Sequence, residues 1–230
     1  GQTVVDVAEV VRQAHAVGAL VLVDGAQAAP HARIDVQAIG ADFYTFSGHK
    51  VYGPMGIGVL WGRTELLDAM PPYQGGGDMI ETVTYESATW NSLPHKFEAG
   101  TPNVPGVLGL AAALDWVEGI GLDAISEHEA DLLSYATEKV SALPGARIVG
   151  TAPQKAGALS FVFDQAHPYD VGTLLDQMGV AVRTGHHCAH PLMRRMGVEG
   201  TIRASLAAYT TRDEIDVLTQ SLERALRMVG

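Results

Sequence analysis

The spacing of apolar residues predicts alternating helices and strands in the first part of the chain. Apolar residues three or four positions apart indicate a helix over residues 7–17. A short apolar run over 19–23, which ends at Asp24, is typical of a buried parallel strand. A short helix over 34–39 and a second strand over 41–46 follow. This order of elements favours an α/β fold.

Later segments continue the same pattern after an irregular stretch. Residues 62–105 show little periodicity, and such a long stretch is usually functional or part of an interface. Gly119-Ile120-Gly121 is expected to break a helix, which predicts a domain boundary between 1–118 and 119–230. The other expected elements are a strand at 56–61, helices at 107–118, 122–143, 171–178 and 213–228, and strands at 147–149, 158–163, 180–183 and 201–206.

The first two strands are expected to lie side by side and parallel, because a right-handed crossover joins strands of this kind. Their carboxyl ends then share one edge of the sheet, and open α/β sheets bind ligands at that edge. Asp24 ends the first strand, and Ser47-Gly48-His49-Lys50 follows the second. Topology alone therefore predicts that Asp24 and Lys50 lie close together.

Composition and charge exclude several classes of protein. With 47% hydrophobic and 18% charged residues, the chain can bury a core and is not expected to be disordered. The net charge of −11 argues against broad binding to nucleic acid or an anionic membrane. No apolar run is long enough for a transmembrane helix, and no secretory leader opens the sequence. A single cysteine excludes an internal disulfide and indicates a reducing, cytoplasmic location.

Lys50 is the first candidate for chemistry, since it is the lone lysine among the first 95 residues. A bare lysine in a loop is most often simply solvated. A lysine at the end of an apolar strand can instead form a Schiff base with an aldehyde cofactor. Ser47, Gly48 and His49 beside it suit a phosphate group.

Asp24 admits two interpretations as well. It can be a turn former, or it can be the buried carboxylate that keeps a pyridine nitrogen protonated. Together with Lys50 it would meet the two main requirements of a pyridoxal phosphate (PLP) site. Gln27, three residues on, can hydrogen-bond the ring oxygen of such a cofactor.

Cys188 lies in Arg183-Thr184-Gly185-His186-His187-Cys188-Ala189-His190, among three histidines and an arginine. A lone cysteine is usually a small buried hydrophobe. This setting favours the nucleophilic thiolate instead. A zinc site built from His186, His187, Cys188 and His190 is an alternative, but the ligand spacing is poor, so we expect no metal.

Arg203 lies in the expected strand at 201–206, downstream of Cys188. It can pair with an acid at the edge of the core. It can equally bind the carboxylate of a substrate through two hydrogen bonds.

These motifs together resemble the group II (Suf-type) cysteine desulfurases, which belong to the class V aminotransferase-like PLP enzymes. The similarity covers essentially the whole chain in order and spacing. The RTGHHCA loop is the most specific match, because group I desulfurases carry the cysteine on a longer loop. The matching stretches are VLVDGAQAAPH, DFYTFSGHKVYGPMGIGVLWG, GGGDMI, FEAGTPN, VRTGHHCAHPLM and IRAS.

The resemblance implies a fold type I PLP enzyme that converts L-cysteine to L-alanine and leaves a persulfide on the protein for iron–sulfur cluster assembly. It implies a homodimer and a sulfur-acceptor protein as partner. The implied roles are Lys50 as Schiff base, Asp24 on the pyridinium nitrogen, Gln27 on the ring oxygen, Ser47 and His49 on the phosphate, Thr101 on the phosphate of the other subunit's cofactor, Arg203 with Arg183 on the substrate carboxylate, and Cys188 as the nucleophile.

The chain departs from this family in length. Members run to about 400 residues, beyond the single-domain range, and their similarity to one another begins well before Gly1. We therefore expect a partial large domain followed by a small C-terminal α/β domain. Two other interpretations stay open at this point. One is a selenocysteine lyase or related PLP lyase, and the other is a non-catalytic module that binds a sulfur-acceptor partner.

Overall fold

The computed structural model describes residues 2–229, which form two compact units. One unit is Asp6–Leu122. The other contains the remaining described residues, 123–229 together with 2–5. Each unit is described by itself below. The division into domains at residues 118 and 119 stays a prediction for the whole protein.

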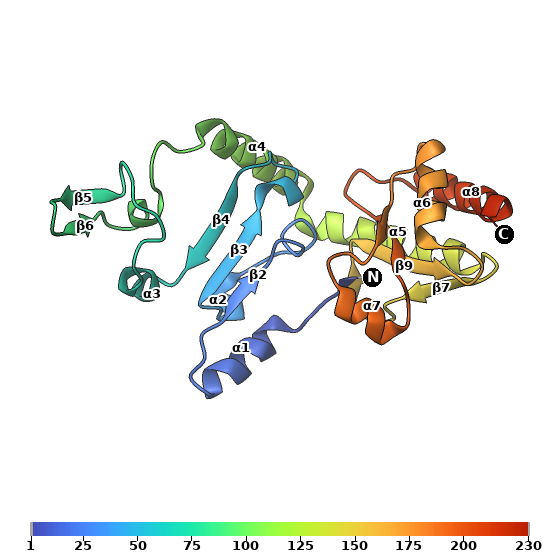
Figure 1. Cartoon of the computed structure of the whole chain (residues 1–230), viewed down its shortest axis with the longest axis horizontal. Coiled ribbons are helices and arrows are strands. Elements are labelled where there is room, and N and C mark those ends of the chain that lie inside the picture. Colours follow the sequence, from blue (N-terminus) through green and yellow to red (C-terminus); the bar gives the residue numbers. More distant parts are fainter. Residues whose placement is uncertain (1, 230) are drawn as a thin grey trace. The chain divides into compact units, whose positions relative to one another are not determined.

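The first unit is built on a three-stranded sheet in the order β2-β3-β4 (Figure 1). Its strands are β2 (Leu22–Asp24), β3 (Phe43–Ser47) and β4 (Gly58–Gly62). β2 and β3 are parallel, and Asp24 lies opposite Thr45. This confirms the predicted parallel pairing, so Asp24 and the segment that follows β3 share one edge of the sheet. β4 pairs with β3 in the antiparallel sense.

Helices and a hairpin complete this unit. The stretch at 62–105 is not irregular as predicted, because it contains a helix and a β-hairpin. The helix at 107–118 is longer than predicted: it begins after the Asn103 cap and passes through Gly119 to end at Gly121. The elements are α1 (Val7–Ala16), α2 (Val36–Ile39), α3 (Thr64–Ala69), α4 (Val104–Ile120), the 3-10 turns η1 (Gly48–Lys50) and η2 (His95–Phe97), and the hairpin strands β5 (Ile80–Val83) and β6 (Ala88–Trp90).

Within the described residues β2 is exposed, whereas the sequence predicted a buried strand. Leu22 is 57% exposed, and Asp24 at the end of the strand is exposed too. Among the described residues β2 pairs with β3 alone, so its outer edge faces solvent. An apolar run reports the tendency of a strand to be buried, whereas its neighbours decide whether it is.

The second unit is a four-stranded antiparallel sheet with helices packed against it. Its strand order is β10-β11-β9-β7, and β9 is buried along its whole length. The strand expected at 180–183 lies instead at Arg183–Gly185, and α7 was not predicted. The elements are β7 (Ala146–Val149), β9 (Ala158–Phe163), β10 (Arg183–Gly185), β11 (Thr201–Ser205), α5 (Leu122–Ser141), α6 (Pro168–Gln177), α7 (His190–Met196), α8 (Arg212–Val229) and the short pair β1 (Gln2–Thr3) and β8 (Lys155–Ala156).

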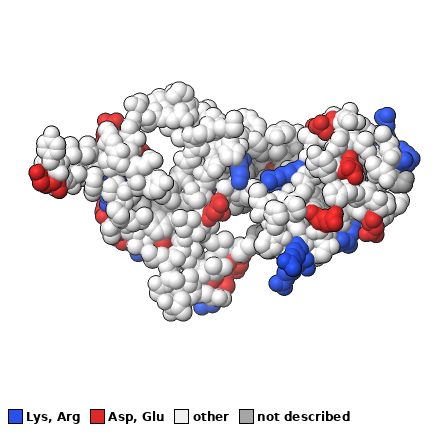
Figure 2. Space-filling view, in the orientation of Figure 1, with Lys and Arg blue, Asp and Glu red and all other residues white. Residues whose placement is uncertain are grey.

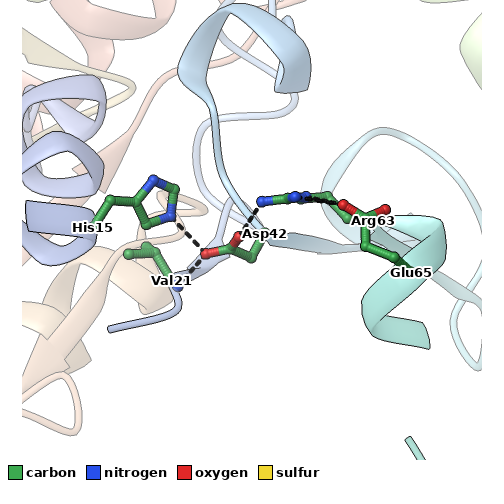
Figure 3. A network of polar contacts seen from close by, with 5 residues as sticks. All are labelled: His15, Val21, Asp42, Arg63 and Glu65. Atoms are coloured by element: carbon green, nitrogen blue, oxygen red, sulfur yellow. Dashed lines mark hydrogen bonds and ion pairs between the residues drawn. The ribbon is translucent and has the colours of Figure 1, made fainter. Parts of the chain in front are cut away.

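A buried carboxylate ties three parts of the first unit together (Figure 3). Asp42, which is fully buried, accepts hydrogen bonds from Val21 N at 2.7 Å and from His15 Nε2 at 2.8 Å. It also pairs with Arg63 Nη1 at 3.1 Å. Burial alone would raise the pKa of Asp42. The hydrogen bonds from His15, Val21 N and Arg63, together with the charge of His15, outweigh burial and hold the pKa below its ordinary value. The network thus connects α1, which carries His15, and Arg63, which follows β4, to Asp42 immediately before β3.

Replacing Asp42 with asparagine should destabilise this unit by about 3 kcal/mol at neutral pH, because it breaks a buried ion pair and leaves its donors poorly satisfied. The carboxylate's pKa is lowered on folding, so its stabilisation is present above the unfolded value and is lost as pH falls through the folded value. The deficit of the variant should therefore shrink in acid. Urea unfolding followed by tryptophan fluorescence measures this, since all three tryptophans, Trp61, Trp90 and Trp116, lie in this unit.

Glu65→Gln is the matched control for that experiment. Glu65 also pairs with Arg63, but it is exposed on α3. An exposed ion pair contributes little, so this variant should unfold close to the parent. Equal stability of Asp42→Asn and the parent at neutral pH would contradict the role given to the buried network.

The described residues include no helix that is long and apolar enough to span a membrane. On the face that Figure 2 draws, basic side chains occur in small separate groups between acidic and uncharged ones. On this face, an anionic ligand would therefore be bound by a local group of basic side chains.

Candidate active site

The candidate cofactor segment begins where β3 ends. The chain turns sharply there into η1, and Gly48 N donates to Ile57 O at 2.9 Å. Gly48 is buried, and a Cβ atom on it would lie 2.8 Å from Ile57 Cγ2. Val51 N donates to Gly48 O at 3.0 Å and closes the turn. Only glycine fits this close approach, and the turn presents His49 and Lys50 at the edge of the sheet.

Three side chains of this segment are available to a ligand. Lys50 is half-buried, Ser47 is half-buried and His49 is exposed. Within residues 2–229, no hydrogen bond or ion pair engages the Ser47 hydroxyl, the His49 imidazole or the Lys50 ammonium. An amine beside a free hydroxyl and a free imidazole is the donor set that an aldehyde cofactor with a phosphate group requires. The residues present therefore fit PLP.

Asp24 lies at the same edge, and of its two interpretations the described residues show the turn former and not a buried carboxylate. It is exposed, and it accepts a hydrogen bond from Ala26 N at 3.0 Å, which shapes the turn after β2. The reason is the open outer edge of β2 described above. Gln27 lies on this turn and is also exposed. Both side chains remain accessible to a ligand at the edge.

Tyr44 is a residue of this region that sequence reasoning missed. Its ring is 4% exposed and packs so closely against Gly25 that a Cβ there would overlap the ring. Its hydroxyl is buried and has no hydrogen-bond partner among the described residues. Burial raises the pKa of Tyr44, and the negative charge of Asp24 raises it further. The packing explains why a glycine follows Asp24.

Thr101 lies in a separate turn of the same unit. It is exposed, and Gly100 before it has φ +83°. Gly100 N donates to Gly77 O at 2.9 Å, which links the GTPN motif to the glycine run at 75–77. The predicted contact of Thr101 with a second subunit's cofactor stays a prediction.

In the second unit, Cys188 lies in the loop between β10 and α7. Its side chain is exposed. Arg183 Nη2 lies 3.5 Å from Cys188 Sγ. A guanidinium at this distance stabilises negative charge on sulfur. An exposed thiol beside a cation is the setting of a reactive cysteine and not of a structural one.

Arg203 lies directly opposite Arg183 across the β10–β11 pair. Like charges in this position destabilise a sheet unless an anion lies between them. Neither guanidinium pairs with an acid in the described part of the chain, and Arg203 Nε is buried without a hydrogen-bond partner. Burial lowers the pKa of Arg203, and the charge of Arg183 lowers it further. The pair is therefore a candidate site for an anion such as a carboxylate.

His187 connects the same loop to Thr201 at the start of β11. Its Nε2 lies 2.7 Å from Thr201 Oγ1 and 3.2 Å from Thr201 O. Burial lowers the pKa of His187, and the charges of Arg203 and Arg183 lower it further, against the raising effect of Thr201. The ring is therefore neutral at neutral pH.

The remaining two histidines of the loop stack on each other. The rings of His186 and His190 have centroids 4.0 Å apart and planes inclined by 17°. Within residues 2–229, no three His, Cys, Asp or Glu side chains gather in a way that holds a metal ion.

Apart from Thr101, the predicted site residues form two groups. Asp24, Gln27 and the segment 47–50 share an edge of the first sheet. Arg183, Cys188 and Arg203 lie together on the second unit.

Comparison with known families identifies the class of protein. Residues 1–218 match the model of the aminotransferase class-V family. The chain belongs to this family, and its mixed α/β fold is the partial fold type I that the motifs predicted.

Individual relatives narrow the comparison to cysteine desulfurases. The chain is 53% identical over 229 residues to a cysteine desulfurase of Dickeya dadantii, covering 99% of this chain and 55% of that protein. It is 54% identical over 224 residues to a cysteine desulfurase of Klebsiella pneumoniae, covering 97% of this chain and 55% of that protein. The chain therefore spans about half the length of these curated relatives.

Solved structures give the same result for the fold. The crystal structure of the cysteine desulfurase CsdA (S-sulfonic acid) from Escherichia coli matches with a TM-score of 0.93 and 44% identity, over 98% of this chain and 56% of that one. The apo cysteine desulfurase from Thermococcus onnurineus matches with a TM-score of 0.93 and 38% identity, over 98% of this chain and 57% of that one.

Proposed function

We propose that the whole protein is a PLP-dependent cysteine desulfurase that converts L-cysteine to L-alanine and keeps the sulfur as a persulfide on Cys188. The observation that carries this proposal is the exposed Cys188 thiol beside Arg183, with Arg203 opposite and no acid paired to either arginine in residues 2–229. The site thus combines a nucleophile with a carboxylate receptor, as desulfuration of an amino acid requires.

The first unit would hold the cofactor. Lys50 would bind it covalently and move protons, while the Ser47 hydroxyl and His49 imidazole would hold its phosphate. Asp24 would pair with the ring nitrogen, and Gln27 with the ring oxygen. When bound, PLP supplies the electron sink that labilises the bond between Cβ and sulfur of the substrate.

The second unit would bind substrate and take its sulfur. Arg203 and Arg183 would bind the cysteine carboxylate, which relieves the repulsion between the two guanidinium groups. The Cys188 thiolate then attacks the substrate sulfur. A sulfur–sulfur bond forms, the Cβ–sulfur bond breaks, and its electron pair leaves with the carbon. That carbon takes a proton and becomes the methyl group of alanine.

A persulfide on an exposed loop is open to a second thiol, so the sulfur would pass to an acceptor protein for iron–sulfur cluster assembly. We further propose that the enzyme works as a cytoplasmic homodimer, in which Thr101 would bind the phosphate of the other subunit's cofactor. The exposed position of Thr101 supports this role.

The proposal predicts equal yields of two products from L-cysteine. The protein at its natural full length, with PLP and L-cysteine and without a reductant, should form one alanine for each sulfur atom bound to Cys188. Amino-acid analysis measures the alanine, and intact mass before and after dithiothreitol measures the bound sulfur. Alanine released together with free sulfide, and no sulfur on Cys188, would contradict the proposal.

A further inference from the structure

The Cys188 loop has an unusual backbone. His187 has φ 52° and Cys188 has φ 62°, so two consecutive residues other than glycine adopt the left-handed conformation. Side chains with a Cβ atom are strained there, and such a conformation persists only where surrounding contacts hold it. The contacts that hold this turn therefore decide where the thiol lies.

His187 provides the main side-chain contact between this turn and the sheet. Its Nε2 contacts both the hydroxyl and the carbonyl oxygen of Thr201, which is 1% exposed at the start of β11. Thr201 pairs with Gly185, the last residue of β10, and Arg203 follows two positions later. The ring thus links the cysteine turn to the strand that carries the anion-binding arginine.

The contacts around His187 favour the neutral tautomer with its proton on Nε2. With a proton on Nε2 the ring donates to Thr201 O, since a carbonyl oxygen accepts only. The other nitrogen, Nδ1, is buried and has no partner in the described residues. A proton on it would add an unpaired donor close to Arg183 on β10 and Arg203 on β11. A bare lone pair in this positive potential is the more stable arrangement.

We propose that His187, as the neutral tautomer protonated on Nε2 and anchored by Thr201, is a positioning residue that holds Cys188 in its strained turn beside Arg183. Its use in sulfur transfer rests on the proposed function, whereas the geometry of the thiol does not. Without the anchor the turn relaxes toward ordinary backbone angles. Sγ then leaves the guanidinium, and the thiolate loses its stabilisation.

Alkylation of the thiol tests this proposal without cofactor or substrate. The chain has one cysteine, so the rate of reaction with iodoacetamide reports on Cys188 alone. His187→Ala should slow alkylation at pH 7 by about threefold to tenfold, the range that loss of one or two hydrogen bonds gives.

Two variants of Thr201 separate positioning from a general loss of structure. Thr201→Val keeps the shape and the carbonyl but removes the hydroxyl at 2.7 Å, so it should slow alkylation at pH 7 by a smaller factor than His187→Ala does. Thr201→Ser restores the hydroxyl and should restore the parent rate. His186→Ala is the matched control, because this neighbouring ring is exposed and stacks on His190 instead.

The results are decisive in either direction. Slower alkylation in His187→Ala and Thr201→Val, with parent rates for Thr201→Ser and His186→Ala, supports the inference. Parent rates for all four variants, or equally slow alkylation in His186→Ala, would overturn it. Neither result depends on desulfurase activity, so failure of the proposed function and failure of this inference are distinguishable.

Discussion

Replacing Lys50 with alanine is expected to abolish covalent attachment of PLP and to lower desulfurase turnover by at least about 100-fold, the lower range for loss of a group that transfers protons. Lys50 is the one lysine on the edge of the first sheet that also carries Asp24. An amine is needed both to bind the aldehyde and to move the proton at the reacting carbon. Intact mass after borohydride reduction with PLP measures attachment directly, whether or not the protein turns over.

Lys155→Ala is the control for this experiment, since Lys155 lies on β8 of the other unit. It should leave the borohydride-stable adduct unchanged, and peptide mapping of the parent should place the adduct on Lys50. An adduct that persists in Lys50→Ala, or that maps to Lys96, Lys139 or Lys155, would remove Lys50 from the proposed role.

The sequence predicted the arrangement of the first sheet edge for a reason that is local. Parallel pairing of β2 and β3 follows from a strand, a short crossover and a second strand, and each has its own apolar spacing. The C-terminal end of α2 was equally readable, because Gly40 ends the helix in the left-handed conformation. Its start was not: the helix predicted at 34–39 begins only after Asp35, whose side chain caps it.

Features that depend on distant neighbours were not predictable in the same way. The exposure of Asp24 depends on what lies beside β2, which no local pattern records. The hairpin of β5 and β6 follows two prolines and three glycines, and these residues obscured its alternation. The contact between His187 and Thr201 joins residues 14 positions apart, and nothing in their spacing indicates it.

In the candidate site, the motifs identified the residues, whereas only the fold gives their geometry. Resemblance to a family named Lys50, Cys188 and Arg203 from the motifs alone. The sequence also grouped Arg183 with Cys188 and with Arg203. It did not give their geometry, in which Arg183 lies opposite Arg203 across β10 and β11 and its Nη2 lies 3.5 Å from Cys188 Sγ. This register places Arg183 next to both the Cys188 thiol and Arg203.

Replacing Cys188 with alanine is expected to eliminate the bound sulfur and to reduce alanine formation from L-cysteine by more than about 100-fold, since even misplacing a reacting group by 1 Å can cost that much. No other cysteine exists in the chain to take over the attack. Lys50 lies in the other unit, so the change does not alter the segment that carries it. Alanine analysis with L-cysteine as substrate, together with intact mass, measures both losses.

L-Selenocysteine as a second substrate makes this variant informative about the competing interpretation. Elimination of selenium does not demand a protein nucleophile, so Cys188→Ala should keep much more of its activity toward L-selenocysteine than toward L-cysteine. That retained activity shows that the cofactor and the carboxylate site of the variant are intact. If the variant instead releases alanine from L-cysteine as fast as the parent does, attack by Cys188 is wrong and a lyase without a sulfur nucleophile explains the protein better. The exposed thiol, 3.5 Å from the Arg183 guanidinium, favours the first result, because a lyase of that kind has no need to hold a cysteine in a strained turn beside a cation.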